Sequence, residues 1–311
     1  MSSSVAVVIL AHNNPPHVRR LIRALRGLDV FLHCDTKTPD DVLAAMTEGL
    51  PDVVLTPRFR TAWAQWGMVE GELAGIRTAL NRSQAEHIVV ASGSCYPLVS
   101  VGELEDELRS WRGLSRLEMY PIPYHPNWST RVGGPDGGLW RFNRRFLRIG
   151  NRLLLARRRY PIPIGRRPVP AMLKLHCASQ WKIYAREHAQ ALLRVLDERP
   201  DLVRFWHGAY TPDETCVVTM LSSPELVGSV ADQLRFDRTW FIDWYDGEGF
   251  GGHPRWLNAD DFPSLQLSRA RRPLQPDDER ERAADARKLL ARKFGPDADE
   301  LLDLIDQELR V

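Results

Sequence analysis

Short apolar runs and helix-like segments alternate through the first hundred residues, and this alternation limits the folds open to the chain. The runs at 5–11, 30–35 and 87–93 are rich in β-branched residues, and each ends in a polar or glycine-containing turn. The segments at 17–27 and 68–80 carry apolar residues at helical spacing. Strands that alternate with helices predict a mostly parallel sheet with helices on both faces, because parallel strands need a crossover connection. The expected fold class is therefore α/β and doubly wound, with ligands bound at the carboxyl ends of the strands.

Two common nucleotide-binding motifs are missing from the turns of this predicted sheet. The turns that follow its strands carry neither G-x-G-x-x-G nor G-x-x-x-x-G-K-[ST]. These glycine-rich loops hold the pyrophosphate of a dinucleotide or the phosphates of a nucleoside triphosphate. Dinucleotide oxidoreduction and P-loop phosphoryl transfer therefore lose their usual sequence support.

The overall charge and the cysteine content argue against several classes of protein. The chain has 42 basic and 40 acidic residues and a net charge of +2, so no overall field marks a nucleic-acid or membrane binder. Its four cysteines form no C-x-x-C pair, which argues against a zinc site or a disulfide-rich framework. The first apolar run is too short to span a bilayer and has no signal-peptide features. We expect a cytoplasmic protein with reduced thiols, without a membrane span and without nucleic acid as a partner.

The segments after residue 120 complete the predicted domain organisation. Residues 121–170 are irregular and rich in Pro, Gly, Trp and Arg, which is typical of a binding loop or lid inside an enzyme. We predict one nucleotide-sugar-binding domain over 1–267, followed by a charged linker or helix over 268–287. Residues 288–311 are amphipathic, and we expect them to form a C-terminal helix that carries Lys293 and completes the same domain.

Four short polar stretches lie where a doubly wound fold places its loops, at 33–37, 92–98, 179–181 and 211–214. Each has an ordinary structural explanation. An Asp after a strand often forms a turn, and Ser-Gly-Ser is a common turn sequence. Pro-Asp-Glu is also a favourable helix start, because proline suits the first turn and carboxylates favour the helix N-terminus. Taken singly, none of these stretches indicates a function.

Together and in this order, the stretches resemble the core-2/I-branching family of glycosyltransferases, which includes β-1,6-N-acetylglucosaminyltransferases and protein xylosyltransferases. The resemblance runs from residue 5 to residue 294. The matching features are His-x-Asp-x-Lys at 33–37, Ala-x-Trp at 64–66, Ser-Gly-x-x-x-Pro-Leu at 92–98, Ala-Ser-Gln-Trp at 178–181, Pro-Asp-Glu at 212–214, Phe-Ile-Asp-Trp at 241–244 and Arg-Lys-Phe at 292–294. Cys95 departs from the family, which usually has an aspartate at that position of the Ser-Gly turn.

The resemblance implies a GT-A-like fold that transfers a sugar in a single displacement, with inversion at the anomeric carbon. The family's glutamate in the Pro-Asp-Glu motif acts as general base on the acceptor hydroxyl, and that position is Glu214 here. An alcohol is a poor nucleophile at neutral pH, and a positioned carboxylate that takes its proton contributes roughly 10²–10⁴-fold to the rate. One carboxylate suffices, because the diphosphate leaving group needs charge neutralisation more than a proton.

Neutralisation of that diphosphate is the second implication of the resemblance. Most GT-A enzymes hold a divalent metal on an Asp-x-Asp motif, but this chain has Ser-Gly-Ser-Cys at 92–95, and serine and thiol are poor ligands for hard cations. The literal Asp-x-Asp at 297–299 is expected to start a helix instead. The resemblance implies a basic pair in place of the metal, and the matching residues are Lys293 and Arg255. Arg238 and Arg235 are the alternatives to Arg255. We therefore expect no metal and no cofactor.

The resemblance also suggests where the two substrates bind. His33 and Asp35 match the nucleotide-binding strand end, where the aspartate contacts uracil or ribose, and a turn-forming aspartate is the alternative. The candidate acceptor-binding residues are Glu118, Arg141, Arg144 and Trp244, of which the tryptophan would stack on a sugar ring. The arginines could instead form a solvated or phosphate-attracting face, and tryptophans are often core in a chain with ten of them.

These observations predict a bacterial, cytoplasmic, inverting and metal-independent transferase that uses a UDP-sugar. N-acetylglucosamine is the first candidate for the transferred sugar and xylose the second; the acceptor hydroxyl belongs to a glycan, a sugar or a natural-product scaffold. Three alternatives stay open: a non-catalytic nucleotide-sugar or carbohydrate-binding protein of the same fold, a nucleic-acid binder that uses residues 141–159, and a metal-dependent transferase. The oligomeric state is left open.

Overall fold

The computed structural model describes residues 3–123, 136–150, 152–156, 160–244, 254–270 and 287–311. In this part of the chain a seven-stranded sheet forms the centre of the molecule, with the strand order β14-β6-β13-β4-β1-β2-β3. The pairings are parallel except where β13 meets its two neighbours. The strands are β1 (Val5–Ala11), β2 (Asp29–Cys34), β3 (Val54–Leu55), β4 (His87–Ser92), β6 (Ser115–Pro121), β13 (His176–Ala185) and β14 (Leu234–Phe236). The predicted α/β class with a mostly parallel sheet is confirmed.

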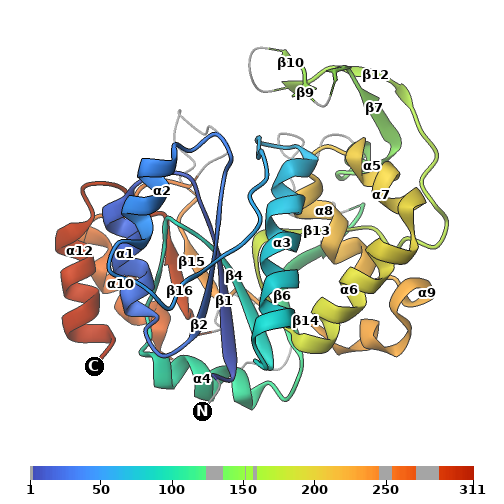
Figure 1. Cartoon of the computed structure of the whole chain (residues 1–311). Helices are drawn as coiled ribbons and strands as arrows, with labels where there is room; N and C mark the ends of the chain where they lie inside the picture. Colours follow the sequence, from blue (N-terminus) through green and yellow to red (C-terminus); the bar gives the residue numbers. More distant parts are fainter. Residues whose placement is uncertain (1–2, 124–135, 151, 157–159, 245–253, 271–286) are drawn as a thin grey trace.

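Helices cover both faces of this sheet (Figure 1). Along β1, Val5, Val7 and Ile9 belong to one buried apolar cluster, and Ala6 and Val8 belong to the other. This alternation is the two-residue period of a strand whose two faces are both buried. The first face is covered by α1 (Pro15–Ala24), α2 (Asp40–Thr47), α4 (Val101–Ser110) and α10 (Phe262–Arg269), and the second by α3 (Trp66–Arg82), α6 (Arg186–Glu198), α7 (Pro200–His207), α8 (Pro212–Leu221) and α9 (Pro224–Val227).

Helix α3 lies unusually close to the sheet because of its glycines. A Cβ added to Gly75 would lie 2.2 Å from Cγ1 of Val8, and one added to Gly71 would lie 2.8 Å from the His33 ring. At the start of the helix, a Cβ on Gly67 would lie 2.2 Å from the carbonyl oxygen of Arg60. The glycines therefore let α3 pack against β1 and β2 and against the loop that precedes the helix.

The C-terminal segment differs from the helix expected over 288–311. Residues Leu290–Arg292 form β16, which lies between β15 (Trp240–Ile242) and β5 (Cys95–Pro97) in a second, three-stranded sheet. Helix α12 begins only at Asp299 and runs as Asp299–Leu304, followed by the π-helical turn Ile305–Leu309. Lys293 therefore directly follows a strand, because pairing on both sides of Leu290–Arg292 holds that segment extended.

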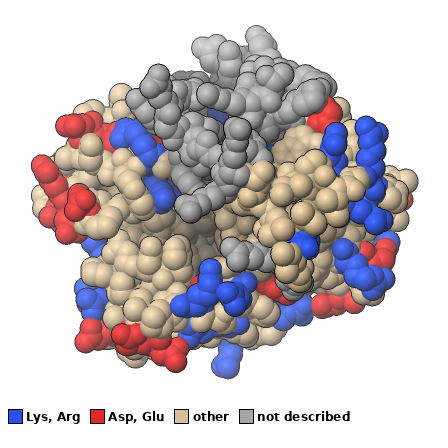
Figure 2. All heavy atoms as spheres, turned by 90° about the horizontal axis from the view of Figure 1, so that it is seen from above, with Lys and Arg blue, Asp and Glu red and all other residues tan. Residues whose placement is uncertain are grey.

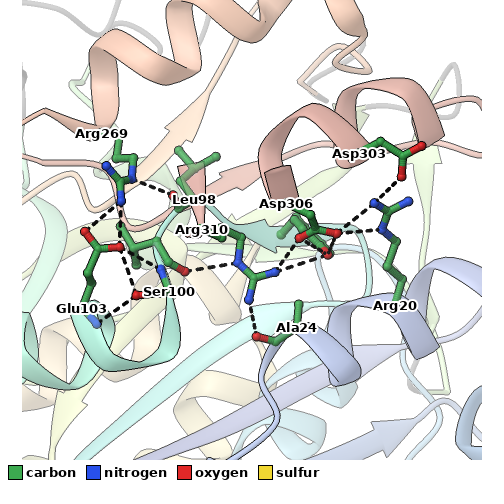
Figure 3. Close-up of polar contacts among 11 residues, drawn as sticks. Arg20, Ala24, Leu98, Ser100, Glu103, Arg269, Asp303, Asp306 and Arg310 are labelled. Carbon is green, nitrogen blue, oxygen red and sulfur yellow. Dashed lines mark hydrogen bonds and ion pairs between the residues drawn. The ribbon is translucent and has the colours of Figure 1, made fainter. Parts of the chain in front are cut away.

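Ion pairs, which Figure 3 shows, and apolar contacts tie this C-terminal segment to the main body. Arg20 on α1 bonds Asp303 at 2.7 Å and Asp306 at 2.8 Å, and Arg310 bonds Asp306 at 2.7 Å. Such partly exposed pairs each contribute little to stability. The larger contribution comes from buried side chains such as Leu301, which belong to the same apolar cluster as α1 and α4. Residues 287–311 are thus packed on the main domain.

Between β6 and β13 along the sequence, the chain forms an arm of short strand pairs. It starts at α5 (Trp140–Asn143) and contains β7 (Arg144–Phe146), β8 (Arg148–Ile149), β9 (Arg152–Leu153), β10 (Leu155–Ala156), β11 (Tyr160–Pro161) and β12 (Pro163–Arg166). The pairs are β7 with β12, β8 with β9, and β10 with β11, and Figure 1 draws them above α7. Residues 124–135, 151 and 157–159 of the irregular stretch predicted over 121–170, and most of the linker predicted over 268–287, lie outside the described residues. None of the described helices is both long and apolar enough to cross a membrane.

Candidate active site

Glu214 lies in the first turn of α8, directly after a backbone residue in a rare conformation. Thr211 precedes the helix with φ 47° and ψ 57°, a left-handed conformation that is uncommon for a β-branched residue. The Glu214 N–H donates to the Thr211 carbonyl at 3.1 Å, and the Thr215 hydroxyl donates to the same oxygen at 3.0 Å. The Glu214 side chain is 42% exposed. The turn therefore holds a carboxylate in a fixed position where a ligand can reach it.

Arg141, predicted to bind the acceptor, lies next to Glu214. Its Nη1 is 3.7 Å from Oε2 of Glu214 and donates a hydrogen bond to the Thr211 hydroxyl at 2.7 Å. The guanidinium is buried and packs against the rings of Trp140 and Tyr210, at 5.1 and 5.4 Å from their centroids. Although Glu214 is partly exposed, displaced solvent raises the pKa of its carboxyl, and the positive charge of Arg141 opposes that rise. Arg141 therefore positions Glu214 and favours its ionised form.

A fully buried ion pair holds the other side of the same turn. Nζ of Lys182 on β13 is 3.2 Å from Oε2 of Glu72 on α3, and both side chains have no exposed surface. The same ammonium donates to the carbonyl oxygens of Gln180 at 2.9 Å and Asp213 at 3.1 Å, while the Tyr184 hydroxyl donates to Glu72. Burial raises the pKa of Asp213, and the charge of Lys182 lowers it, as it does for Glu214. Sequence reasoning missed Lys182. Its position between Trp181 and the apolar run Ile183–Ala185 is a signal for a buried partner.

At the carboxyl end of β2, Asp35 organises the neighbouring loop. Its carboxylate accepts from the Lys37 N–H at 2.7 Å, from the Thr61 N–H at 3.2 Å and from the Thr61 hydroxyl. The Lys37 ammonium lies 3.3 Å away. Burial by itself would raise the pKa of Asp35, but the hydrogen bonds from Thr61 and Lys37 outweigh it and hold the pKa below its ordinary value. Asp35 is thus an ionised group that fixes the 59–61 loop at the strand end.

His33, which was predicted to bind the nucleotide, is placed differently from Asp35. Its ring is buried against Gly71, and its Nε2 accepts a hydrogen bond from the Phe59 N–H at 3.1 Å. Burial lowers the pKa of His33 to about 4, so the imidazole is neutral near pH 7. In the structure His33 therefore fixes the backbone of the loop that meets Asp35.

A histidine and two lysines, His12, Lys37 and Lys293, share this corner with Asp35. Burial lowers the pKa of His12, which follows β1, and the charges of Lys37 and Lys293 lower it further, while Asp35 raises it. These electrostatic contacts bring the ends of β1, β2 and β16 together. Nζ of Lys293 lies 3.9 Å from the centroid of the Trp256 ring, a cation–π contact. Sequence reasoning missed His12, although its place after the first strand is the expected one for a ligand-binding residue.

Arg292, the neighbour of Lys293, has an unusual environment. Its guanidinium lies 4.3 Å from the centroid of the Trp181 ring, and its Nε and Nη1 are buried without a hydrogen-bond partner among the described residues. In β16 it stands opposite Cys95 of β5, at the Ser-Gly turn. The Cys95 thiol is buried and accepts from the Ser92 N–H at 3.4 Å. A buried cation without a counter-charge is costly, so this position favours an anionic ligand.

Arg255 and Arg238, the two arginines that the sequence analysis assigns to the diphosphate, already have carboxylate partners. Arg255 bonds Asp243 at 2.6 Å through Nε and Asp261 through both terminal nitrogens. Arg238 lies 3.2 Å from Glu118, one of the predicted acceptor-binding residues, and donates to the Tyr120 hydroxyl at 2.6 Å. Their positive charges are therefore largely balanced within the protein.

The remaining predicted acceptor residues lie away from the Glu214 turn along the chain. Arg144 begins β7 and makes no ion pair with Glu214 among the interactions of the described residues. Trp244 is 49% exposed and is the last described residue before the gap at 245–253. An aromatic residue that sequence reasoning missed, Trp63, is 45% exposed and meets the Tyr210 ring edge-on at 5.8 Å. It links the Asp35 loop to the Arg141–Glu214 side of the site.

In the parts of the chain that the structure describes, no group of three or more His, Cys, Asp or Glu side chains is arranged to hold a metal ion. The literal Asp-x-Asp ends at Asp299, which starts α12 as the sequence predicts. The site as described consists of a base-like carboxylate, a strand-end carboxylate and several cations.

Comparisons with known proteins identify the family. The family model described as Core-2/I-Branching enzyme matches residues 5–268. A search of curated proteins finds no match. Among solved structures, mouse xyloside xylosyltransferase 1 in its apo form is similar with a TM-score of 0.38 and 12% identity, over 80% of this chain and 91% of that chain. The 4-diphosphocytidyl-2C-methyl-D-erythritol synthase of Anaerococcus prevotii is similar with a TM-score of 0.31 and 8% identity, over 64% and 76% of the two chains. Because the family model covers most of its length, the chain belongs to the Core-2/I-branching enzyme family and is a glycosyltransferase with a GT-A-like α/β fold.

Proposed function

We propose that this glycosyltransferase moves a sugar from UDP to an acceptor hydroxyl with inversion, without a metal, and with Glu214 as the general base. The observation that carries the proposal is the Glu214 turn. A partly exposed carboxylate sits on a strained helix start, with Arg141 at 3.7 Å and the buried Lys182 behind its backbone. Both positive charges favour the ionised carboxylate, which is the form that takes a proton from an alcohol.

For the diphosphate leaving group, we propose the pair Arg292 and Lys293 in place of Arg255 and Arg238. Arg292 offers two buried N–H groups without a partner among the described residues, whereas Arg255 is bonded to two aspartates. Fixed cations aimed at the developing phosphate charge can stabilise a leaving group without reorganisation of solvent. Lys293 adds a second positive charge on the adjacent residue.

The nucleoside is proposed to bind at the ends of β1 and β2, beside Asp35, His12 and the loop that carries Thr61. N-acetylglucosamine is the first candidate for the transferred sugar and xylose the second. The acceptor hydroxyl is proposed to belong to a glycan, a sugar or a natural-product scaffold, and the exposed Trp63 indole provides an apolar surface between the two sides of the site.

The deciding experiment measures sugar transfer and UDP binding for Glu214→Gln. We expect turnover to fall by roughly 10²–10⁴-fold while the affinity for UDP stays within a few-fold of the wild-type value. The matched control is Glu225→Gln, the same change at an exposed glutamate on α9, which should leave both unchanged. Transfer by the Glu214→Gln variant at the wild-type rate would refute the assignment of the base, and full activity in EDTA would exclude a metal-dependent reaction.

A further inference from the structure

An exposed tryptophan is connected to the proposed base through two intervening side chains. Trp63 is 45% exposed, and its ring meets the Tyr210 ring edge-on, with 5.8 Å between the centroids. The Tyr210 centroid also lies 5.4 Å from Cζ of Arg141, whose Nη1 is 3.7 Å from Oε2 of Glu214. The four side chains therefore form a series of contacts that leads from an exposed indole to the carboxylate.

Two residues beside these rings have a backbone conformation that is rare outside glycine. Ala64, which follows Trp63, has φ 59°, and Thr211, which follows Tyr210, has φ 47°. Such residues persist only where the surrounding structure holds them, and they cluster at functional sites. Both are buried, and Ala64 belongs to the same apolar cluster as Tyr210 and Phe146. The fold therefore holds the backbone on which both rings stand.

Trp63 lies between the two proposed substrate sides, and its ring contact is on the side of the base. Two positions earlier, the Thr61 N–H donates to Asp35 at 3.2 Å, which ties the loop to the proposed nucleoside side. The indole itself meets Tyr210, which directly precedes the turn that holds Glu214. A ligand on this indole is therefore closer to the proposed base than to the strand end at Asp35.

The surface at this end of the molecule suits an uncharged ligand. Helix α3 begins just after Trp63, at the top of Figure 1, and Figure 2 looks down on that end. There, uncharged side chains make up much of the described surface between the groups of charged ones. A pyranose ring has an apolar face of C–H groups and a rim of hydroxyls, and tryptophan offers a large apolar surface. An exposed indole near a carboxylate that accepts a hydroxyl proton therefore fits a sugar ring.

We propose that Trp63 stacks on a pyranose ring of the acceptor and thereby determines which acceptors the enzyme uses. The apolar face of the ring covers the exposed indole, and the hydroxyl-bearing rim is directed toward Glu214. This inference rests on the proposed function, because the acceptor hydroxyl must lie where the base takes its proton. The competing occupant is the uracil of the donor, since every base has a face that stacks on an aromatic ring. The contact of the indole with Tyr210 favours the acceptor.

The test observes the Trp63 indole directly, in the full chain labelled with 5-fluorotryptophan. The chain has ten tryptophans, and the ¹⁹F resonance that is lost in Trp63→Phe belongs to Trp63. The probes are the methyl pyranosides of glucose, galactose, N-acetylglucosamine and xylose. We expect at least one of them to shift this resonance, and to shift it more than UDP does. Sorbitol and galactitol, which offer hydroxyls without a ring, should leave it in place.

Two substitutions measure how much the indole contributes to binding. For the pyranoside that shifts the resonance most, Trp63→Ala should weaken binding about tenfold or more, because truncation of an aromatic side chain that carries binding energy typically costs at least that much. Trp63→Phe should weaken it less, since a ring remains. Binding is followed by saturation-transfer NMR on the ligand, and circular dichroism checks folding. The matched control is Leu267→Ala, which removes an exposed apolar side chain from α10 and should leave binding unchanged.

Three results would each overturn the proposal: no methyl pyranoside shifts the Trp63 resonance, the alditols shift it as much as the pyranosides do, or UDP shifts it more than every pyranoside. The last result would assign the indole to the nucleoside. Glu214→Gln separates a failure of this inference from a failure of the proposed function. If it abolishes transfer while no pyranoside shifts the Trp63 resonance of the wild type, the stacking is refuted and the base is retained.

Discussion

Substitution of Lys182 by methionine tests how the buried ion pair supports the Glu214 turn. Methionine keeps most of the length of the lysine stem but removes the ammonium, which bonds Glu72 and the carbonyl oxygens of Gln180 and Asp213. The Glu72 carboxylate then stays fully buried, with the Tyr184 hydroxyl as its remaining donor among these groups. Removing one partner of a buried pair typically costs about 3–5 kcal/mol, because it leaves an uncompensated charge.

That cost is large compared with the total stability of a typical domain, which is about 5–15 kcal/mol. It should be relieved by a second change, Glu72→Gln, which removes the stranded charge and keeps an oxygen for the Tyr184 hydroxyl. In the Lys182→Met background, Glu72→Gln should therefore stabilise the protein by about 2 kcal/mol, although on its own it should destabilise it.

The assay is urea unfolding of the four proteins in a double-mutant cycle, followed by tryptophan fluorescence. Lys174→Met is the matched control, because Lys174 is exposed just before β13 and its replacement should change the free energy of unfolding by no more than about 0.5 kcal/mol. A loss below about 1 kcal/mol for Lys182→Met, or strictly additive effects of the two substitutions, would refute the reasoning that an ionic pair supports the turn.

Three further predictions concern the site and the buried histidines. Arg141→Gln should raise the apparent pKa of the acidic limb of the kcat/KM profile, because the cation that opposes protonation of Glu214 is lost; an unmoved limb would contradict this. Arg292→Gln should weaken the binding of UDP by about tenfold or more and leave uridine binding unchanged in calorimetry, because only the diphosphate would meet the guanidinium; equal effects on both ligands would count against a phosphate contact. Burial lowers the pKa of His33 and His188 to about 4, so between about pH 6.5 and pH 4 the unfolded chain binds protons that the folded chain does not. The free energy of unfolding should therefore fall as the pH is lowered through that range, on the order of 3 kcal/mol per histidine, and His188→Asn should reduce the dependence; a flat profile in the wild type would contradict the assignment of buried neutral rings.

The sequence was most informative where structure depends on local patterns. The apolar run at 5–11 predicts a buried strand, and the helical spacing at 68–80 predicts a helix with one buried face. The structure has β1 and α3 at these positions. The helix expected over 288–311 was wrong at its start, because Leu290–Arg292 pairs with two strands that come from residues 95–97 and 240–242. The amphipathic pattern of residues 288–311 does not show that part of this segment pairs with strands so distant in the sequence.

Ordered motifs placed Glu214 and Asp35, but they did not reveal what surrounds them. Nothing around Arg141 in the sequence shows that its guanidinium meets Glu214, 73 positions further along the chain. His33 matched a family position, yet its ring is enclosed by α3, because Gly71 lets the helix approach. Lys182 offered a usable signal, a charge within an apolar strand, and Glu72 is the buried partner that this signal implies.

By itself the sequence determined the α/β class, the family resemblance and the position of the proposed base, because hydrophobic periodicity and ordered motifs are properties of the chain read in order. Only the tertiary structure decided which cations remain available for an anionic ligand. Arg255 and Arg292 look alike in the sequence, but Asp243 and Asp261 balance the charge of the first, while the second packs on Trp181 with two buried nitrogens unpartnered among the described residues. The physical reason is that the charge a ligand meets depends on burial and on counter-charges brought together by folding, and neither is fixed by the residue type alone.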